Sequence, residues 1–140
     1  MEYLAPEEIR KNKENVKERF GRQLDQRPLA LKGRCVDIFE KAISGKSATV
    51  LDFGTGHGAF LRAIYGNGYN NIYAGDIDDY VDGSIRPLLK DFKAFDASFE
   101  KFPWSDKTFD VVTAWEVFEH LENPHNAIRE VHRILGGVAS

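Results

Sequence analysis

The sequence is nearly devoid of cysteine: Cys35 is the only one, so no disulfide can form within the chain. It also has no apolar run of membrane length and no apolar segment typical of a secretory signal. Because structural disulfides are typical of oxidising compartments, these features together predict a cytoplasmic protein without membrane association.

An excess of positive charge is also missing. The chain has 19 lysine and arginine residues against 22 acidic ones, a net charge of −3 at pH 7. The net charge therefore provides no general electrostatic attraction for nucleic acid, and a nucleic-acid substrate is not indicated. A local basic patch is still compatible with this net charge. At 140 residues, 42% of them hydrophobic, the sequence is sufficient for one domain with a packed core.

What the sequence does contain is a glycine-rich turn between an apolar segment and a helical pattern. Residues 49–51 are apolar and β-prone, as expected for a buried parallel strand, and residues 58–65 have the pattern of a helix. Between them, glycine occupies alternate positions, namely Gly54, Gly56 and Gly58. Such a turn needs positive φ angles and close approach of the backbone, so it favours binding of a nucleotide-like ligand.

The glycine spacing alone fits two cofactors. Gly54, Gly56 and Ala59 satisfy the relaxed pattern G-x-G-x-x-G/A of NAD-binding folds. Asp52, at the end of the first strand, favours the other cofactor, since a carboxylate is unfavourable beside a pyrophosphate but suits a cation. S-adenosylmethionine carries a sulfonium and an ammonium, and no phosphate.

On these residues the chain resembles the class I S-adenosylmethionine-dependent methyltransferases, whose first motif is an acid followed by G-x-G-x-G. The resemblance implies an α/β, Rossmann-like doubly wound sheet, partial and in the order 3-2-1-4, and methyl transfer to an unidentified oxygen, nitrogen or carbon nucleophile. The charged, glycine-poor composition of the first forty residues sets apart an N-terminal helical segment, 1–44, from a cofactor-binding domain, 45–140. Because the match stops before three of the usual seven strands, an inactive S-adenosylmethionine-binding module is an alternative, as is an NAD-dependent oxidoreductase.

A second strand, Ile72–Asp76, ends in another acid. Asp76 lies 22 residues after Gly54, the separation at which an acid accepts hydrogen bonds from ribose hydroxyls in doubly wound folds. The resemblance assigns Asp76 the same role and places Ile77 against the adenine. Further along the chain, Gly83 and Pro87 predict a short or broken helix within 80–89.

A third strand, 92–95, ends at Asp96. The resemblance implies that Asp96 binds the exocyclic amine of adenine and that the backbone amide of Ala97 meets a ring nitrogen. The expected cofactor site therefore gathers residues from three strand ends: Asp52, Gly54, Thr55, Gly56, Asp76, Ile77, Asp96 and Ala97.

The fourth strand, predicted over 109–115, brings Trp115 to the methionine end of this site, where it forms a wall of the transfer pocket or a core aromatic contact. In the order 3-2-1-4 this strand has a free edge, which is a template for pairing. We therefore expect a homodimer or another protein partner to cover it.

After the fourth strand, Glu116, Glu119 and His120 would project from one face if the segment were helical. This E-x-x-E-H pattern resembles the metal-binding helix of small-RNA 3′-end methyltransferases and a segment of ubiquinone-pathway O-methyltransferases. The histidine that completes the RNA enzymes' site comes from further downstream than this sequence extends, so we predict no metal here. No catalytic base can be identified, and His120 and Glu116 are the candidates.

The remaining segments are predicted to be helical. Two helices beginning near Pro6 and Pro28 either pack on the domain or form a lid over the cofactor, as such helices do in the resembled class. A last helix begins at Pro124 and ends before Gly136 and Gly137.

Overall fold

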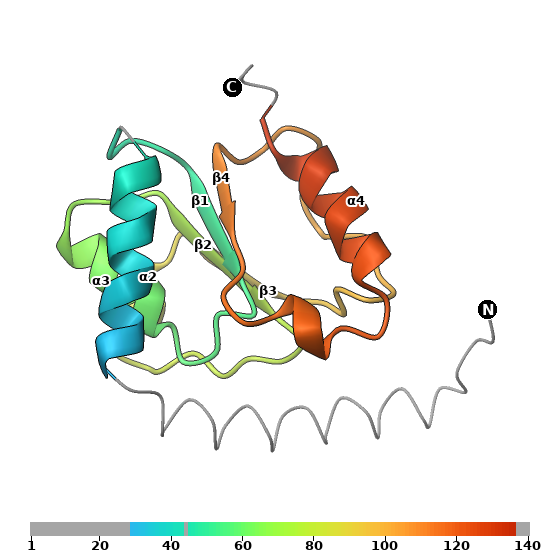
Figure 1. The fold of residues 1–140 in the computed structure, drawn as a ribbon, viewed down its shortest axis with the longest axis horizontal. Helices are drawn as coiled ribbons and strands as arrows, with labels where there is room; N and C mark the ends of the chain where they lie inside the picture. Colours follow the sequence, from blue (N-terminus) through green and yellow to red (C-terminus); the bar gives the residue numbers. More distant parts are fainter. Residues whose placement is uncertain (1–28, 44, 137–140) are drawn as a thin grey trace.

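The computed structural model describes residues 29–43 and 45–136. Its centre is a four-stranded sheet in the order β3-β2-β1-β4, and all three pairings are parallel (Figure 1). This arrangement confirms the predicted Rossmann-like α/β fold and its strand order. The strands are β1 (Val50–Phe53), β2 (Ile72–Asp76), β3 (Asp91–Ala94) and β4 (Val111–Thr113).

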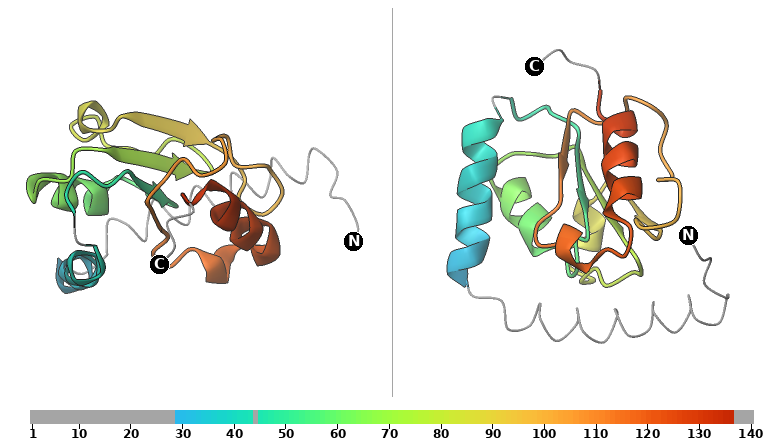
Figure 2. Two further views of the ribbon diagram at one scale, coloured as in Figure 1. Left: turned by 90° about the horizontal axis from the view of Figure 1, so that it is seen from above. Right: turned by 45° about the vertical axis from the view of Figure 1, so that its right-hand side comes forward.

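Helices cover both faces of the sheet. Figure 2 shows α2 and α3 on one side and α4 on the other. The helices are α2 (Leu29–Ala42), α3 (Ala59–Gly66) and α4 (Pro124–Ile134), with short 3₁₀ turns η1 (Arg86–Leu88) and η2 (Phe118–His120). None of the helices in these described ranges is both long and apolar enough to cross a membrane. The helix predicted before Pro28 lies outside the described residues, and the division of the chain at residue 44 stays a prediction.

Each face of the sheet has its own apolar cluster, because alternate residues of a strand point to opposite sides. On the face of α2 and α3, Val50, Ile72 and Ala74 pack with Phe39 and Phe60. On the face of α4, the buried residues include Leu51, Phe53, Phe95, Phe102, Phe109 and Ile134. Two predicted site residues, Asp52 and Asp76, have the parity of Val50 and Ile72, and therefore lie on the α3 face with the glycine turn.

Two predicted elements near β4 differ from the structure. The predicted strand 109–115 is shortened to Val111–Thr113, because the backbone turns away at Glu116, which has a positive φ of 55°. The edge of this strand is also not entirely open, since Phe109 forms a parallel bridge with Leu135 and accepts a hydrogen bond from the N–H of Gly136. The broken helix predicted within 80–89 is confirmed as η1.

Candidate functional site

The glycine turn joins β1 to α3 at the C-terminal edge of the sheet, the lower edge in Figure 1. The predicted positive φ angles are confirmed: 71° at Gly54, 59° at Gly56 and 95° at Gly58. Side chains are also excluded by space, because a Cβ on Gly54 would lie 2.3 Å from a methyl carbon of Val117, and one on Gly58 would lie 2.9 Å from Ile85. Side chains of neighbouring elements are thus packed tightly against the turn.

Asp76 holds the middle of this turn from the end of β2. Its Oδ2 accepts a hydrogen bond from the Gly56 N–H at 2.8 Å, and its Oδ1 accepts one from the Ile77 N–H at 2.7 Å. Burial raises the pKa of Asp76 to about 6, against the lowering effect of these two hydrogen bonds, and the charge of Asp78 adds to the rise. The two strand ends are therefore joined through one buried carboxylate.

Asp52 is 2% exposed and lies within β1, not after it. Its register partner on β4 is Thr113, and the Thr113 hydroxyl donates a hydrogen bond to Asp52 Oδ1 at 2.7 Å. The carboxylate is therefore oriented by the neighbouring strand at the sheet edge that bears the glycine turn.

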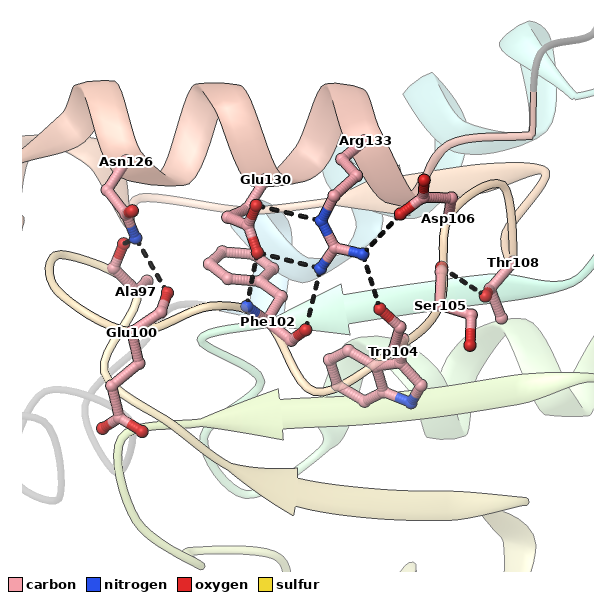
Figure 3. A network of polar contacts seen from close by, with 10 residues as sticks. All are labelled: Ala97, Glu100, Phe102, Trp104, Ser105, Asp106, Thr108, Asn126, Glu130 and Arg133. Atoms are coloured by element: carbon pink, nitrogen blue, oxygen red, sulfur yellow. Dashed lines mark hydrogen bonds and ion pairs between the residues drawn. The ribbon is translucent and has the colours of Figure 1, made fainter.

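Asp96 and Ala97 begin a compact loop after β3. Asp96 Oδ1 accepts a hydrogen bond from the Ser98 N–H, and the Asp96 N–H donates to Glu100 Oε1. The start of α4 is attached to this loop, because the Asn126 side-chain amide donates to the carbonyl oxygens of Ala97 and Glu100, both at 2.9 Å (Figure 3). Ser98 makes a second connection, with its hydroxyl oxygen accepting hydrogen bonds from two backbone N–H groups just before α4.

Trp115 lies beyond the end of β4 and packs on Phe60 at the start of α3, with ring centroids 5.2 Å apart. The structure thus places it among aromatic side chains close to the glycine turn. Its half-buried indole is compatible with both predicted roles, a wall of the transfer pocket and a core contact.

The condition under which Glu116, Glu119 and His120 would share one face, a helical segment, is not met. Only residues 118–120 form a 3₁₀ turn, and Glu116 precedes it in a left-handed backbone conformation. The three side chains do not project from one helical face. Among residues 29–43 and 45–136, no group of three histidine, cysteine or acidic side chains is arranged to hold a metal ion.

Three of the buried polar atoms on the segments that follow β1, β2 and β4 have no hydrogen-bond partner within the part of the chain that the structure describes. They are the Thr55 hydroxyl oxygen, the Tyr80 hydroxyl oxygen and the Trp115 indole nitrogen. Thr55 belongs to the turn itself, and the backbone carbonyl of Tyr80 lies 3.1 Å from His57 Nδ1 in the same turn. Because buried polar groups are nearly always paired, each of these atoms is a candidate contact for a polar ligand.

A family model for a methyltransferase domain matches residues 16–139. The chain belongs to this methyltransferase domain family. The match supports the identification made from Asp52 and the glycine turn, and it covers the sheet and the helices on both of its faces.

Individual relatives of this methyltransferase domain are longer than the chain. An uncharacterized protein of Methanocaldococcus jannaschii is 35% identical over 102 residues, which are 70% of this chain and 40% of that protein. Among solved structures, a chain of the complex that contains the Trm112 methyltransferase activator of Haloferax volcanii is 28% identical, with a TM-score of 0.54 over 64% of this chain and 41% of that one. A SAM-dependent methyltransferase from Aquifex aeolicus is 26% identical, with a TM-score of 0.57 over 71% and 57%. The chain thus spans about two fifths of the first two of these relatives.

Sequence reasoning missed several residues that position the site of this methyltransferase domain. Thr113 could have been found by aligning β4 with β1, since the two parallel strands share a register. Ser98 and Asn126 have no local signal, because their partners lie 24 to 29 residues away in the chain. Tyr80 was overlooked because it lies in an irregular loop.

Proposed function

We propose that this methyltransferase domain binds S-adenosylmethionine at the C-terminal edge of the sheet, and that the enzyme containing it transfers the methyl group to an oxygen, nitrogen or carbon nucleophile. The observation that carries this proposal is that three buried polar atoms, of Thr55 after β1, Tyr80 after β2 and Trp115 after β4, have no hydrogen-bond partner among the described residues. Leaving such groups unpaired costs about 1–3 kcal/mol each, and a polar ligand would remove that cost.

The residues present fit the cofactor. The positive φ angles of Gly54 and Gly56 form the tight turn that lets the backbone approach a ligand closely, and Asp76 would accept hydrogen bonds from the ribose hydroxyls. Each Asp76 oxygen already accepts one N–H but has a second lone pair available for a hydroxyl. In this proposal Ile77 packs on the adenine, while Asp96 and the Ala97 amide bind its polar edge.

The other end of the site would hold the cationic part of the cofactor. Asp52 supplies negative charge there, and Trp115 supplies an aromatic wall. When bound, S-adenosylmethionine supplies a methyl group on a positively charged sulfur. The protein's main contribution is to hold the acceptor in line with that group, and such orientation can correspond to effective molarities of about 10⁵ M or more.

The proton of the acceptor requires a base only for some substrates. His120 and Glu116 are the candidates near the end of β4. His120 is half-buried, and its Nε2 lies 3.8 Å from Glu119 Oε1. An acceptor that loses its proton to solvent would need neither residue.

We also propose a protein partner at the outer edge of β4, in a protein that works in the cytoplasm. Within the described part of the chain, β4 is the last strand of the sheet on that side, with only the bridge between Phe109 and Leu135 beyond it. A homodimer or another protein could pair there. Light scattering that shows a stable monomer at high concentration would contradict the homodimer.

Titration calorimetry tests the cofactor assignment. S-adenosylhomocysteine and NAD are titrated separately into the protein. Binding of S-adenosylhomocysteine, and no binding of NAD, is expected. Binding of NAD alone would overturn the proposal in favour of an oxidoreductase. If S-adenosylhomocysteine binds, incubation with labelled S-adenosylmethionine and a panel of acceptors then separates an enzyme from a module that only binds.

A further inference from the structure

The Tyr80 hydroxyl is one of the buried polar atoms that support the proposed function, but which part of the cofactor it would contact has not been assigned. Tyr80 lies in the loop between β2 and η1, and its side chain is half-buried. Its oxygen is inaccessible to solvent and has no hydrogen-bond partner within residues 29–43 and 45–136. A hydroxyl kept in this state is unfavourable unless something binds to it.

The position of Tyr80 is fixed from the glycine turn. The carbonyl oxygen of Tyr80 lies 3.1 Å from His57 Nδ1, and because a carbonyl only accepts, this ring nitrogen carries the hydrogen. In return, the His57 carbonyl accepts a hydrogen bond from the Asp82 N–H at 3.0 Å. These two contacts hold the backbone of the Tyr80 loop against the turn.

The electrostatic surroundings keep the hydroxyl protonated. Burial raises the pKa of Tyr80, and the negative charges of Asp76 and Asp78 raise it further. The hydroxyl is therefore a hydrogen-bond donor at neutral pH, and it is near enough to Asp76 to be influenced by that carboxylate.

We propose that the Tyr80 hydroxyl donates a hydrogen bond to the nucleoside half of the bound cofactor. This inference rests on the proposed function. A ribose hydroxyl that donates to Asp76 still has oxygen lone pairs, so it can accept from a neighbouring donor. Tyr80 follows β2, the strand that ends in Asp76, whereas Asp52 and Trp115 belong to β1 and to the end of β4. The donor is thus on the ribose side of the site.

The test compares wild type, Tyr80→Phe and the control Tyr65→Phe, which alters an exposed tyrosine on α3. Calorimetry of the full chain measures the dissociation constants of S-adenosylhomocysteine and of methylthioadenosine, which lacks the amino-acid part. Tyr80→Phe is expected to weaken both ligands by a similar factor, about 3- to 10-fold, the range for one hydrogen bond. Tyr65→Phe should bind both ligands like wild type.

Thermal unfolding without ligand separates binding from structure. Because Tyr80→Phe removes a hydroxyl without a partner, its melting temperature should equal or exceed that of wild type. A lower melting temperature with unchanged affinity would overturn the proposal and assign the hydroxyl a structural partner. If Tyr80→Phe weakened the binding of S-adenosylhomocysteine but left that of methylthioadenosine unchanged, the placement of the hydrogen bond on the nucleoside would be overturned. If wild type binds neither ligand, the proposed function fails as well, whereas equal binding by wild type and Tyr80→Phe excludes the role of Tyr80 alone.

Discussion

The Asp76 carboxylate accepts a hydrogen bond from the Gly56 backbone N–H at 2.8 Å, and this contact joins the end of β2 to the middle of the glycine turn. The acid that sequence spacing assigns to a ribose thus also stabilises the turn that approaches the ligand. Because burial raises the pKa of Asp76 to about 6, the charge on which this arrangement depends is sensitive to pH in a range that is easy to study.

Replacement of Asp76 by asparagine should therefore change the pH dependence of stability. Between the ordinary pKa of 3.8 and the folded value of about 6, the native protein binds more protons than the unfolded chain. The contribution of Asp76 to the free energy of unfolding is fully present below its ordinary pKa, and it is lost as the pH rises through its pKa in the folded protein. Each unit of difference between the two pKa values corresponds to 1.36 kcal/mol, so the loss of stability is about 3 kcal/mol at most.

Urea unfolding of wild type and Asp76→Asn, followed by circular dichroism at about pH 4 and about pH 7, measures this effect. Asparagine does not titrate in this range, so the variant should gain stability relative to wild type as the pH rises. Curves that stay parallel across the range would contradict the role of the buried charge.

Gly54→Ala should destabilise the fold and abolish cofactor binding. Alanine at a φ of 71° costs about 1–2 kcal/mol, and overlap of its Cβ with Val117 at 2.3 Å adds about 1–3 kcal/mol. Chemical unfolding should therefore show a loss of about 2–5 kcal/mol. The control is Gly83→Ala, where a Cβ meets nothing within 4 Å, and its effect should stay within about 0.5 kcal/mol. Equal stability of the two variants would contradict the tight packing of the turn.

The double variant Gly54→Ala/Val117→Ala separates the two causes. Removing the Val117 methyl groups relieves the overlap but leaves alanine in a left-handed conformation. We therefore expect the combined loss to be smaller than the sum of the two single losses, because the residues are in contact. Additive losses would show that backbone conformation alone makes glycine necessary at this position.

The sequence predicts the parts of the site that depend on short-range chemistry. Positive φ angles require glycine, and a parallel strand ends where its apolar pattern stops, so Gly54 and Asp76 could be located from their neighbours alone. The backbone conformation of Glu116 could not be predicted in this way. Its left-handed conformation depends on how the chain leaves a three-residue strand and packs Val117 on Gly54. A helical E-x-x-E-H pattern is locally acceptable there, and tertiary packing overrides it.

Arg133 on α4 should be a major stabilising residue of the loop 102–106. Its guanidinium donates to the carbonyl oxygens of Phe102 and Trp104 and to the carboxylates of Asp106 and Glu130 (Figure 3). A lysine ammonium cannot reproduce this planar set of donors, so Arg133→Lys should lower the free energy of unfolding by about 1–3 kcal/mol.

The matched control for this change is Arg129→Lys, which alters an exposed arginine on the same helix. Thermal and urea unfolding of both variants should show a loss for Arg133→Lys only. Similar losses in both would mean that the network contributes little beyond an exposed ion pair, which is commonly worth less than about 1 kcal/mol.

Asn126→Ala should loosen the loop that we assign to the adenine, although Asn126 itself is a positioning residue. The Asn126 amide holds the carbonyl oxygens of Ala97 and Glu100, so its removal deprives the backbone from 97 to 100 of two hydrogen bonds to α4. Amide hydrogen exchange at Phe99 and Glu100 should become faster in the protein without ligand. The dissociation constant of S-adenosylhomocysteine should rise about 3- to 10-fold, because binding must then reorder the loop.

Asn123→Ala is the matched control for this prediction, since Asn123 is the neighbouring asparagine at the start of α4 and its side chain makes no capping hydrogen bond. It should leave both the exchange rates and the affinity close to those of wild type. If Asn126→Ala behaved like this control, α4 would not position the Asp96 loop. If exchange alone became faster, the loop would be held by Asn126 but would not take part in cofactor binding, and the assignment of Asp96 and Ala97 to the adenine would fail.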